Sequence, residues 1–439
     1  MPKVYIKTFG CQMNKSDSEL MECSLLKSGF RVSNDPHSAD IHIFNTCSVR
    51  EHAEDRAISH IKSIRDTVRI KGGVIVVAGC MAQRIGKELI DKEIADLAVG
   101  PYQSPRVGEI LNIFLKERAK CLYTSLEYED FESRINHVLD YSKDVPTWHK
   151  WIAITHGCNN FCSYCIVPYV RGPLISFPSD SIIENIKSLV TIGIKEISLL
   201  GQNVNQFGMD TGDIPFHKLL ERAARIVGLA RINFLTSHPK DFNEDIISVI
   251  RDYKNISRSI HLPLQSGSNR ILKLMNRGYS MEDYLDIVER IDGELDNYSI
   301  STDFIVGFPG ETEDDFEATL RAVDIVRFDE AFTYVYSPRK DTPAYSIKET
   351  LSRAMKLDRL NTLIAKQREI SCERLSERLN CIEEMIVERL SKRSEYEVMG
   401  KTSFNHPVVI PGSAEDVGRV IKIRVSSLRG ATLYGERLA

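Results

Sequence analysis

The chain has 439 residues, and its hydrophobic fraction of 42% and charged fraction of 27% are those of a folded globular protein rather than a disordered or fibrous one. Its net charge of −4 gives no overall attraction to nucleic acid, so any nucleic-acid site must be local. The sequence lacks a charged leader with an apolar run behind it and a stretch of about 20 apolar residues, so we expect a cytoplasmic protein.

The first 118 residues alternate short β-branched runs with helical patterns. The runs KVYIKTFG, IHIFN and VIVVAG have the composition of strands, and helical patterns separate them. Strands that alternate with helices form parallel sheets covered on both faces. We therefore predict a doubly wound α/β domain over residues 2–118. The acidic and aromatic segment LEYEDFE then breaks the pattern, which indicates a linker over residues 119–147.

Six further strand candidates alternate with helical patterns over residues 148–373. They are WIAIT, KEISLLG, RINFLT, RSIHLPL, SISTDFIVG and AFTYVYS. Six βα repeats are fewer than the eight of a closed barrel, so we predict an open, partial (β/α)6 barrel. Its functional residues are expected at the carboxyl ends of the strands.

The last part of the chain, residues 374–439, follows a long charged amphipathic stretch and consists of short strand patterns separated by Gly and Pro. This pattern predicts a small all-β barrel, OB-like in character. A compact terminal β module either binds nucleic acid or serves as a structural cap. The motif GRVIKIRV alternates as a strand does, which is expected to put its basic side chains on one face. The candidate phosphate contacts are Arg419, Lys422 and Arg424.

Three cysteines follow the first barrel strand in the motif HGCNNFCSYC. Ten cysteines in a protein expected in the reducing cytosol favour metal or redox chemistry over disulfides. Cys158, Cys162 and Cys165 can bind three irons of a 4Fe-4S cluster and leave the fourth iron open to S-adenosylmethionine. Electron transfer into that sulfonium yields a 5′-deoxyadenosyl radical. The alternative is a structural zinc site, for which His156 is the nearest fourth ligand.

A second set of cysteines is spread over the N-terminal domain. Cys11, Cys47 and Cys80 each stand just past the carboxyl end of a predicted parallel strand. Those ends meet at one edge of a parallel sheet, so the three thiols can converge into a metal site. The alternative is that they are small core residues, since free cysteine is often buried. The other cysteines show no such placement and are interpreted as core or incidental residues: Cys23, Cys121, Cys372 and Cys381.

The chain resembles the methylthiotransferase family of radical S-adenosylmethionine enzymes. The segments that carry the resemblance are TFGCQMNKSDSE, NTCSVREHAEDR, AGCMAQR, THGCNNFCSYCIVPYVRG, LLGQNVNQFG, TSHP, HLPLQSGSNRILKLMNRGY and TDFIVGFPGETEDDF. The resemblance implies an N-terminal methylthiotransferase domain with its own 4Fe-4S cluster, a radical core with a second one, and a C-terminal TRAM domain that binds RNA. The two cysteine sets fall on the positions of the two clusters.

Within this family, CQMN after the first strand resembles the branch that acts on tRNA adenosine. The resemblance implies methylthiolation of carbon 2 of N(6)-dimethylallyladenosine next to the anticodon, with sulfur inserted by radical chemistry and a methyl group drawn from S-adenosylmethionine. The implied partners are tRNA, an electron donor such as flavodoxin or ferredoxin, and a sulfur or Fe-S cluster donor. The alternatives are threonylcarbamoyladenosine in tRNA, a ribosomal-protein aspartate, and a non-catalytic Fe-S protein that binds RNA.

One segment departs from the family pattern. After Arg171 and Gly172 the family usually reads RGxExSR, whereas this chain reads RGPLISF, with Leu174 and Phe177 where Glu and Arg are expected. The sequence alone leaves open whether the carboxylate of Asp180 takes the place of the missing Glu.

Seven residues at the expected barrel mouth are candidate contacts of S-adenosylmethionine. An aromatic residue before the last cluster thiol fits beside the adenine in the family, and a glycine at a strand end permits close backbone approach to a ligand. The alternatives are a packed loop aromatic, ordinary turn residues and a satisfied structural carboxylate. The loop GFPGE lacks the Lys-Ser/Thr ending of a P-loop and is interpreted as a barrel-mouth loop. The candidates are Tyr164, Gly201, Gln202, Asn203, Gln265, Ser266 and Asp303.

Overall fold

The structure is a computed structural model that describes residues 1–48, 51–117, 121–127, 134 and 147–438. Its N-terminal part is a six-stranded parallel sheet in the order β2-β1-β3-β4-β5-β6. Helices α1 and α4 pack on one face of this sheet, and α2 and α3 pack on the other. The elements are β1 (Lys3–Thr8), α1 (Gln12–Lys27), β2 (Arg31–Val32), β3 (Ile41–Thr46), α2 (Glu51–Ile70), β4 (Val74–Gly79), α3 (Cys80–Asp91), β5 (Leu97–Val99), η2 (Pro101–Arg106), α4 (Val107–Glu117) and β6 (Cys121–Tyr123).

The predicted α/β domain is confirmed, but its sheet extends past the predicted boundary at residue 118. Strand β6 pairs in parallel with β5 and forms the edge of the sheet, so the segment predicted to be a linker begins with a strand. The strands missed by sequence, β2, β5 and β6, have only two or three residues each, too few to show a periodic pattern. Most of the predicted linker, residues 128–133 and 135–146, lies outside the described residues.

The central part is the predicted open barrel of six parallel strands. Three strands pair in the order β11-β10-β7 and three in the order β12-β13-β14. A parallel bridge between Ile232 and Ile256 links the two halves. The strands are β7 (His149–Ala153), β10 (Glu196–Leu200), β11 (Arg231–Phe234), β12 (Ser259–His261), β13 (Ser299–Val306) and β14 (Glu330–Val335), and a short antiparallel pair β8 (Thr155–His156) and β9 (Ile175–Ser176) follows β7.

Helices cover the outer face of this barrel and bury one continuous apolar core between themselves and the strands. Helix α13 packs against β14 and runs to Ser376, so it continues through the boundary predicted between residues 373 and 374. The helices are α6 (Val167–Arg171), α7 (Ser179–Thr191), α8 (Phe216–Ala224), α9 (Glu244–Asp252), α10 (Asn269–Leu274), α11 (Met281–Glu294), α12 (Glu313–Val326) and α13 (Arg353–Ser376).

The C-terminal part is a closed five-stranded barrel in the order β15-β16-β17-β19-β18, as predicted. Alternate residues of β18 point into its apolar core, where Ile421, Ile423 and Val425 are buried. We call this barrel the β module. Its strands are β15 (Ile382–Leu390), β16 (Glu397–Thr402), β17 (Pro407–Pro411), β18 (Val420–Arg429) and β19 (Thr432–Arg437).

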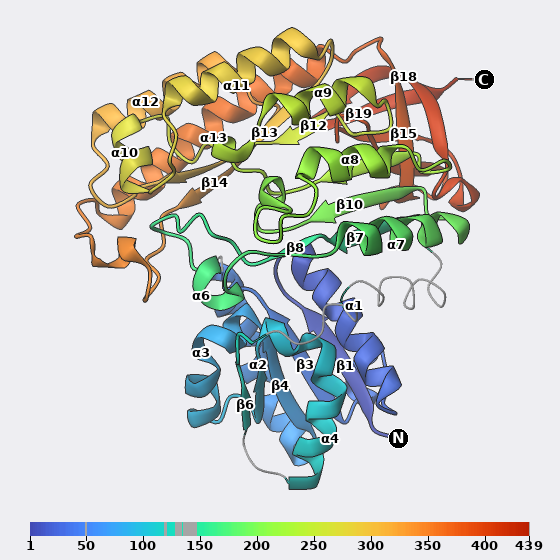
Figure 1. Cartoon of the computed structure of the whole chain (residues 1–439), viewed down its shortest axis with the longest axis vertical. Coiled ribbons are helices and arrows are strands. Elements are labelled where there is room, and N and C mark those ends of the chain that lie inside the picture. Colours follow the sequence, from blue (N-terminus) through green and yellow to red (C-terminus); the bar gives the residue numbers. More distant parts are fainter. Residues whose placement is uncertain (49–50, 118–120, 128–133, 135–146, 439) are drawn as a thin grey trace.

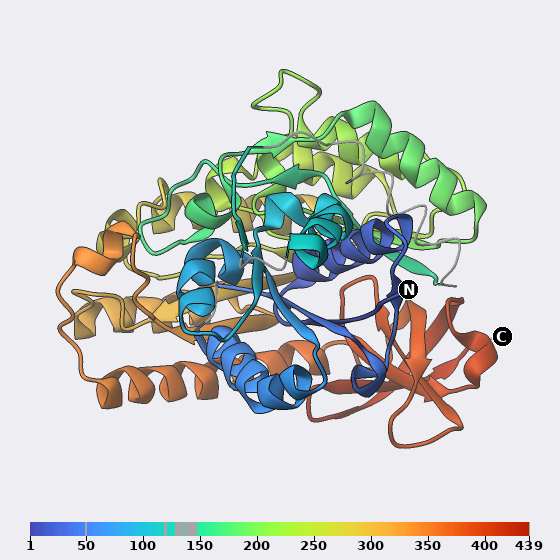
Figure 2. The same cartoon turned by 90° about the horizontal axis from the view of Figure 1, so that it is seen from below.

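The N-terminal domain and the β module contact different parts of the central barrel, as Figure 1 and the turned view in Figure 2 show. The carboxyl edge of the N-terminal sheet lies against the first barrel strand and the cysteine loop through contacts of α1 with β7 and of α3 with α6. The β module contacts the barrel where β11 and β12 begin. None of the described helices combines the length and apolar composition of a membrane span.

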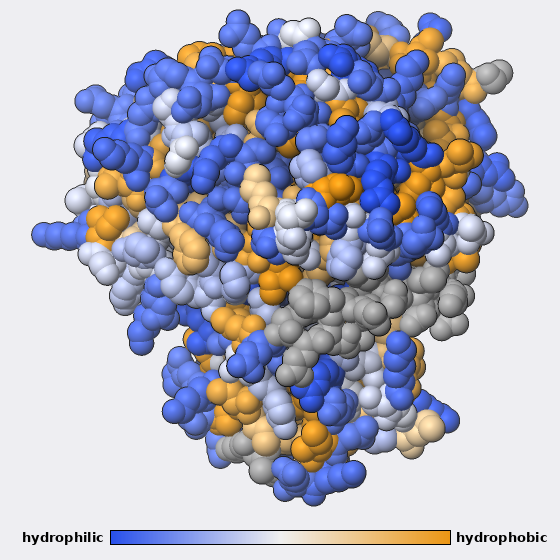
Figure 3. Space-filling model, viewed as in Figure 1, coloured by the Kyte–Doolittle hydropathy of each residue, from blue (hydrophilic) through white to orange (hydrophobic). Residues whose placement is uncertain are grey.

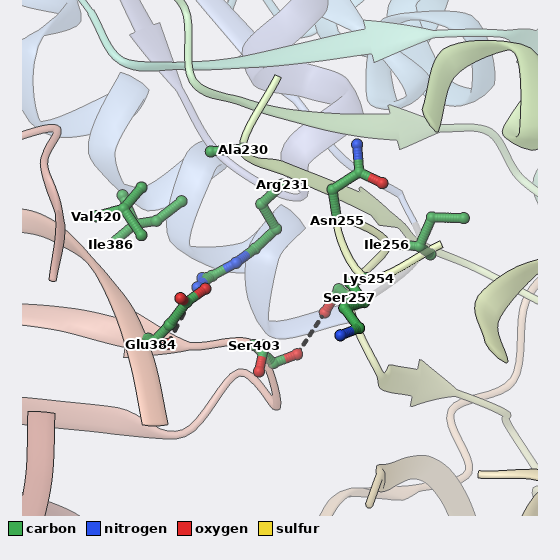
Figure 4. A pocket seen from close by; sticks show the side chains of 10 residues that line it. All are labelled: Ala230, Arg231, Lys254, Asn255, Ile256, Ser257, Glu384, Ile386, Ser403 and Val420. Carbon is green, nitrogen blue, oxygen red and sulfur yellow. Dashed lines mark hydrogen bonds between the residues drawn. The ribbon is translucent and has the colours of Figure 1, made fainter. Parts of the chain in front are cut away.

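A polar junction fixes the β module to the barrel (Figure 4). Arg231, at the start of β11, donates to the carbonyl oxygens of Lys401 at 3.0 Å and Glu384 at 3.4 Å. Ser257 donates its hydroxyl to the carbonyl oxygen of Ser403 at 2.8 Å. Because these bonds join side chains of the barrel to the backbone of the β module, they set the orientation of the module.

Candidate functional site

The cysteine loop between β8 and α6 lies at the carboxyl end of the first barrel strand. It carries Cys158, Cys162 and Cys165. The pairing of β8 with β9 folds the chain back over this loop. Gly157, just before the first cysteine, has φ +73°, and a β carbon there would lie 1.8 Å from the carbonyl oxygen of Pro173. Glycine is therefore required for the turn that begins the loop.

The three thiols of this loop influence one another in a low-dielectric setting. Cys158 and Cys162 are buried and Cys165 is partly buried. Burial, with a further contribution from the charge of Cys162, raises the pKa of Cys158 to about 11 and that of Cys165 to about 12. Thiols this close to one another fit a shared metal cluster better than three independent core positions.

Arg277 places a buried positive charge beside this loop. Its Nη1 lies 3.4 Å from the sulfur of Cys162 and 3.4 Å from the hydroxyl of Tyr164, and its Nη2 donates to the carbonyl oxygen of Pro263 at 2.8 Å. No carboxylate of the described residues pairs with it. A buried cation is costly unless an anion compensates it, and cluster thiolates would provide that anion. His238 Nε2 lies 3.9 Å from the same sulfur.

The N-terminal cysteines meet at the carboxyl edge of the sheet, as predicted. Cys11 caps α1, Cys47 follows β3 and Cys80 begins α3, and β1, β3 and β4 are adjacent strands. A β carbon on Gly10 would lie 2.5 Å from that of Cys47, so these two loops are in direct contact. The hydrogen bond with the Cys47 thiol is the largest cause that lowers the pKa of Cys11 to about 6. The three residues therefore form one site.

Two buried asparagines hold the loops of this site together. Asn14 Nδ2 donates to Asn45 Oδ1 at 3.2 Å, and Asn45 Nδ2 donates to the backbone carbonyl oxygen of Asn14 at 2.7 Å. The Cys11 thiol donates to Asn14 Oδ1 at 3.3 Å. A β carbon on Gly79 would lie 2.4 Å from Asn45 Oδ1, so this pair also needs the glycine before Cys80. The polar network fixes the spacing of the three cysteine loops.

Helix α6 joins the two cysteine groups. It begins two residues after Cys165, and Ile166 and Val170 pack against Cys80 of the N-terminal domain. At its end, Arg171 donates from Nε to the sulfur of Cys80 at 3.2 Å and from Nη2 to Asp17 at 2.7 Å. The two groups therefore face each other across the domain interface.

His156, the nearest fourth ligand for the alternative of a zinc site, lies in the short strand before the cysteine loop. Its ring packs edge-on against Tyr102 at a centroid distance of 4.7 Å. Within the described residues, no group of three or more His, Cys, Asp and Glu side chains is placed to hold one ion. A zinc site needs its ligands to converge on one atom, whereas each thiolate of a 4Fe-4S cluster binds a different iron.

Unpartnered polar atoms gather past the carboxyl ends of the barrel strands. Gln202 Oε1, Ser237 Oγ and Gln265 Oε1 follow β10, β11 and β12, and these buried atoms have no hydrogen-bond partner in the part of the chain that the structure describes. Gln265 also has φ +75°, a strained conformation for a residue with a side chain. Buried polar groups are normally satisfied, so these atoms fit a polar ligand that enters the barrel mouth.

The other predicted cofactor contacts have protein partners of their own. Asn203 caps η3 (Val204–Gln206) and donates to Asp241 at 2.6 Å. Ser266 accepts a hydrogen bond from the backbone of Ser268 at 3.2 Å. The space beside Gly201 is filled by Thr155, whose Oγ1 would lie 2.3 Å from a β carbon there. The glycine thus serves packing against the neighbouring strand.

Asp303 and Tyr164 retain some exposure at the mouth of the barrel. Asp303 lies on the less buried face of β13, 3.5 Å from Nε2 of His261. Tyr164 is half-buried and packs against an apolar cluster that includes Met275 and Phe308. Each of these side chains therefore contacts other residues of the protein and is still accessible from the barrel mouth.

The departure from the family pattern puts two apolar side chains into the core. Leu174 is 5% exposed and Phe177 is fully buried, the latter inside the main barrel core. Asp180 does not compensate for the missing Glu, because its side chain is 86% exposed and pairs with Arg222 at 2.7 Å. This segment is therefore packed as core and carries no charge toward the barrel mouth.

The basic residues of the β module do not share one face as predicted. Lys422 and Arg424 point outward from β18, but Arg419 precedes the strand, is out of phase with them and lies 3.4 Å from Asp416. Lys422 stands opposite Glu384 and Arg424 opposite Glu436. In Figure 3 apolar side chains gather over this module. The outer face of β18 is therefore mixed rather than strongly basic.

The sequence argument missed the buried charged residues that lie beside the two cysteine groups. Asp17 follows the CQMN motif on α1, Arg171 ends the cysteine segment and Arg277 lies on a loop past β12. All three are buried, with exposed fractions of 1%, 3% and 5%. Charged residues are almost never fully buried unless paired, but no spacing in the sequence reveals burial. All three residues lie inside segments that carry the family resemblance, but the sequence argument gave none of them a role.

Three known sequence families match successive parts of the chain. Residues 3–100 match the Uncharacterized protein family UPF0004, residues 152–323 match the Radical SAM superfamily, and residues 382–438 match the TRAM domain. These ranges correspond to the N-terminal sheet domain, the open barrel and the β module.

Solved structures of radical enzymes share the fold. The methyltransferase TsrM from Kitasatospora setae, solved with tryptophan and an analogue of S-adenosylmethionine, is 15% identical with a TM-score of 0.57 over 79% of this chain and 75% of that chain. The cobalamin-dependent radical enzyme OxsB is 12% identical with a TM-score of 0.51 over 84% of this chain and 56% of that chain. At these identities the likeness concerns the fold alone.

Relatives of known name match almost the entire chain. The tRNA-2-methylthio-N(6)-dimethylallyladenosine synthase of Natranaerobius thermophilus is 39% identical over 439 residues, which cover 99% of this chain and 96% of that protein. The protein of the same name from Clostridium tetani is 40% identical over 440 residues, with the same coverage. The chain therefore belongs to the family of tRNA-2-methylthio-N(6)-dimethylallyladenosine synthases within the radical S-adenosylmethionine enzymes.

Proposed function

We propose that this protein is an enzyme that transfers a methylthio group to carbon 2 of N(6)-dimethylallyladenosine next to the anticodon of tRNA. The observation that carries the proposal is the pair of three-cysteine groups that face each other across α6, in a chain whose relatives are named for this reaction. The names of these relatives favour this substrate over threonylcarbamoyladenosine, a ribosomal-protein aspartate or a non-catalytic role.

The barrel group would generate the radical. Cys158, Cys162 and Cys165 would hold a 4Fe-4S cluster with one open iron, which supplies the electron that cleaves S-adenosylmethionine. Around it, Arg277 places a positive charge beside the cysteine loop. The unpartnered atoms of Gln202 and Gln265 would accept hydrogen bonds from the cofactor and hold it at the barrel mouth. The fixed position of these groups restricts the orientation in which the substrate meets the radical.

The other predicted residues would act at the rim of the same site. Tyr164 and Asp303 are exposed enough to contact the cofactor. Gly201, Asn203 and Ser266 would shape the loops through the packing and hydrogen bonds described above, and any contact that they make with the cofactor would come from their backbone.

Cys11, Cys47 and Cys80 would hold a second, auxiliary 4Fe-4S cluster, which gives the enzyme two clusters. This auxiliary site lies at the interface that faces the barrel, where it can supply sulfur to a substrate activated by the radical. A sulfur or Fe-S cluster donor and an electron donor such as flavodoxin or ferredoxin would be needed for turnover.

The β module would hold the tRNA, with Arg419, Lys422 and Arg424 as phosphate contacts. The match of residues 382–438 to the TRAM domain and the tRNA-modifying relatives support this role. A tRNA substrate also supports a cytoplasmic location for the enzyme. We assign the functional units to residues 2–123, 148–376 and 382–438, with boundaries moved from the predicted ones to the ends of β6 and α13.

Metal analysis and product analysis together test this proposal. The protein reconstituted with iron and sulfide under anaerobic conditions should hold about eight irons, because each three-thiolate site holds one four-iron cluster. Incubation with dithionite, S-adenosylmethionine and tRNA that carries dimethylallyladenosine should release 5′-deoxyadenosine and give the 2-methylthio nucleoside by mass spectrometry. About four irons, unchanged on replacement of Cys47, would remove the auxiliary cluster, and release of no 5′-deoxyadenosine would remove the radical function.

A further inference from the structure

Arg171 belongs to the barrel domain but its guanidinium lies in the auxiliary site of the N-terminal domain. It is 3% exposed, and its Nε donates to the sulfur of Cys80 at 3.2 Å. Within the described residues, its Nη1 is buried and has no hydrogen-bond partner. A cysteine sulfur is a weak acceptor for a neutral donor, whereas a thiolate that faces a guanidinium makes a charge-assisted hydrogen bond.

Neighbouring charges hold this guanidinium in place. Asp17, 1% exposed, accepts hydrogen bonds from Arg171 Nη2 at 2.7 Å and from Arg134 Nη1 at 2.9 Å. Burial alone would raise the pKa of Asp17, but the charges of Arg171 and Arg134 outweigh it and hold that pKa below its ordinary value. The carboxylate is therefore ionised and fixes the direction of the Arg171 fork. The backbone carbonyl of Arg171 accepts from Tyr102 at 3.1 Å, which anchors the end of α6.

Arg171 and Arg134 share one carboxylate but differ in their contact with the auxiliary site. Both pair with Asp17, and Arg171 also reaches the sulfur of Cys80. An ion pair that served only to join the domains would not need this contact with a cysteine.

We propose that Arg171 is a positioning residue of the auxiliary site that raises the reduction potential of its cluster, through the hydrogen bond to Cys80 and through its charge. The inference rests on the proposed auxiliary cluster. Hydrogen bonds to the sulfurs and the net charge around a cluster set its potential, and both contributions favour the reduced, more negative state. Because Arg171 comes from the barrel domain, docking of the two domains completes the electrostatic environment of the auxiliary cluster.

The test uses the full chain with Cys158, Cys162 and Cys165 replaced by alanine, so that only the auxiliary cluster is loaded. The midpoint potential is measured by a redox titration followed by electron paramagnetic resonance. Arg171→Gln keeps a polar side chain and removes the charge, and Arg134→Gln is the matched control, because it removes the other buried arginine of Asp17 without touching Cys80. The hydrogen bond and the charge both favour the reduced cluster over the oxidised one, so Arg171→Gln should lower the reduction equilibrium constant about tenfold, or about 59 mV for one electron.

The outcomes separate this inference from the proposed function. A larger downward shift for Arg171→Gln than for Arg134→Gln supports the inference, and equal shifts or no shift overturn it. If Arg171→Gln does not load a cluster, Arg171→Lys replaces it in the test. Lysine keeps the charge but loses the planar fork, so a smaller downward shift is expected, and an unchanged potential refutes the assignment. A parent protein that binds no iron refutes both the auxiliary cluster and the role of Arg171.

Discussion

Replacement of Arg231 by alanine should loosen the β module from the barrel. Arg231 is the residue of the junction that binds two carbonyl oxygens of the module, and it lies 3.6 Å from Glu196 of the neighbouring strand. Both side chains of this ion pair are about nine-tenths buried. In the variant, Glu196 keeps the hydrogen bond from Asn233 at 2.6 Å but loses its arginine partner, and two backbone carbonyls lose a charged donor.

The expected cost follows from these losses. Removal of one partner of a buried ion pair costs about 3–5 kcal/mol because the other charge is left uncompensated. The cavity beside Arg231 has a volume of about 30 Å³, which is enough for a water molecule to replace part of the lost hydrogen bonding. We therefore expect the lower end of the range, about 3 kcal/mol. This free energy corresponds to junction opening that is more frequent by roughly two orders of magnitude.

Hydrogen exchange at the junction measures this opening. The amide of Arg258 donates to the carbonyl oxygen of Ser403 across the interface at 3.2 Å, so its exchange rate reports separation of the two parts. In Arg231→Ala its exchange should accelerate about a hundredfold. Arg222→Ala is the control, because Arg222 forms an exposed pair with Asp180 whose loss should cost less than about 1 kcal/mol. Equal exchange in the two variants would refute the assignment of Arg231 as the anchor of the module.

Three further predictions address the N-terminal domain and the RNA surface. Glu54→Ala should destabilise the protein by about 3–5 kcal/mol in urea unfolding, since Arg84 and Arg339 lose their shared buried carboxylate; a change as small as that of the exposed Glu88→Ala would contradict this. Gly79→Ala should reduce the iron bound after reconstitution by up to half, because its β carbon would collide with Asn45 at φ +82°; full iron content would show that the loops adapt. Replacement of both Lys422 and Arg424 by glutamate should weaken tRNA binding and reduce its salt slope by about two, whereas the same exchange at Lys187 and Lys218 of the barrel helices should not; equal binding at every salt concentration would assign the β module to a structural role.

Sequence alone was sufficient for the fold, because the strands and helices follow local patterns, and it predicted that the N-terminal cysteines lie together. Cys11, Cys47 and Cys80 could be placed together since parallel topology brings strand ends to one edge. The short strands were not predicted because they have too few residues to show a periodic pattern; β6, for example, has three residues. The predicted domain boundary after residue 373 falls inside α13, because the composition does not change along this helix.

The environment of the site depends on contacts between distant segments, which no local pattern reveals. Asp17 and Arg171 are 154 positions apart and meet only when α6 docks on the N-terminal sheet. Arg419 was assigned to the wrong face because it precedes β18 and its direction is set by Asp416. Leu174 and Phe177 are buried for the same reason, since the packing of distant segments decides which side chains are covered.

The most direct test of two clusters with separate roles is to quantify 5′-deoxyadenosine and 2-methylthio nucleoside for Cys162→Ala and Cys80→Ala under reducing, anaerobic conditions. Cys162→Ala removes one of three ligands of the radical cluster and should form neither product. Cys80→Ala leaves the barrel core in its own domain and should still release 5′-deoxyadenosine while it forms no methylthio product. Normal methylthiolation by the Cys80 variant would contradict the assigned role of the auxiliary site.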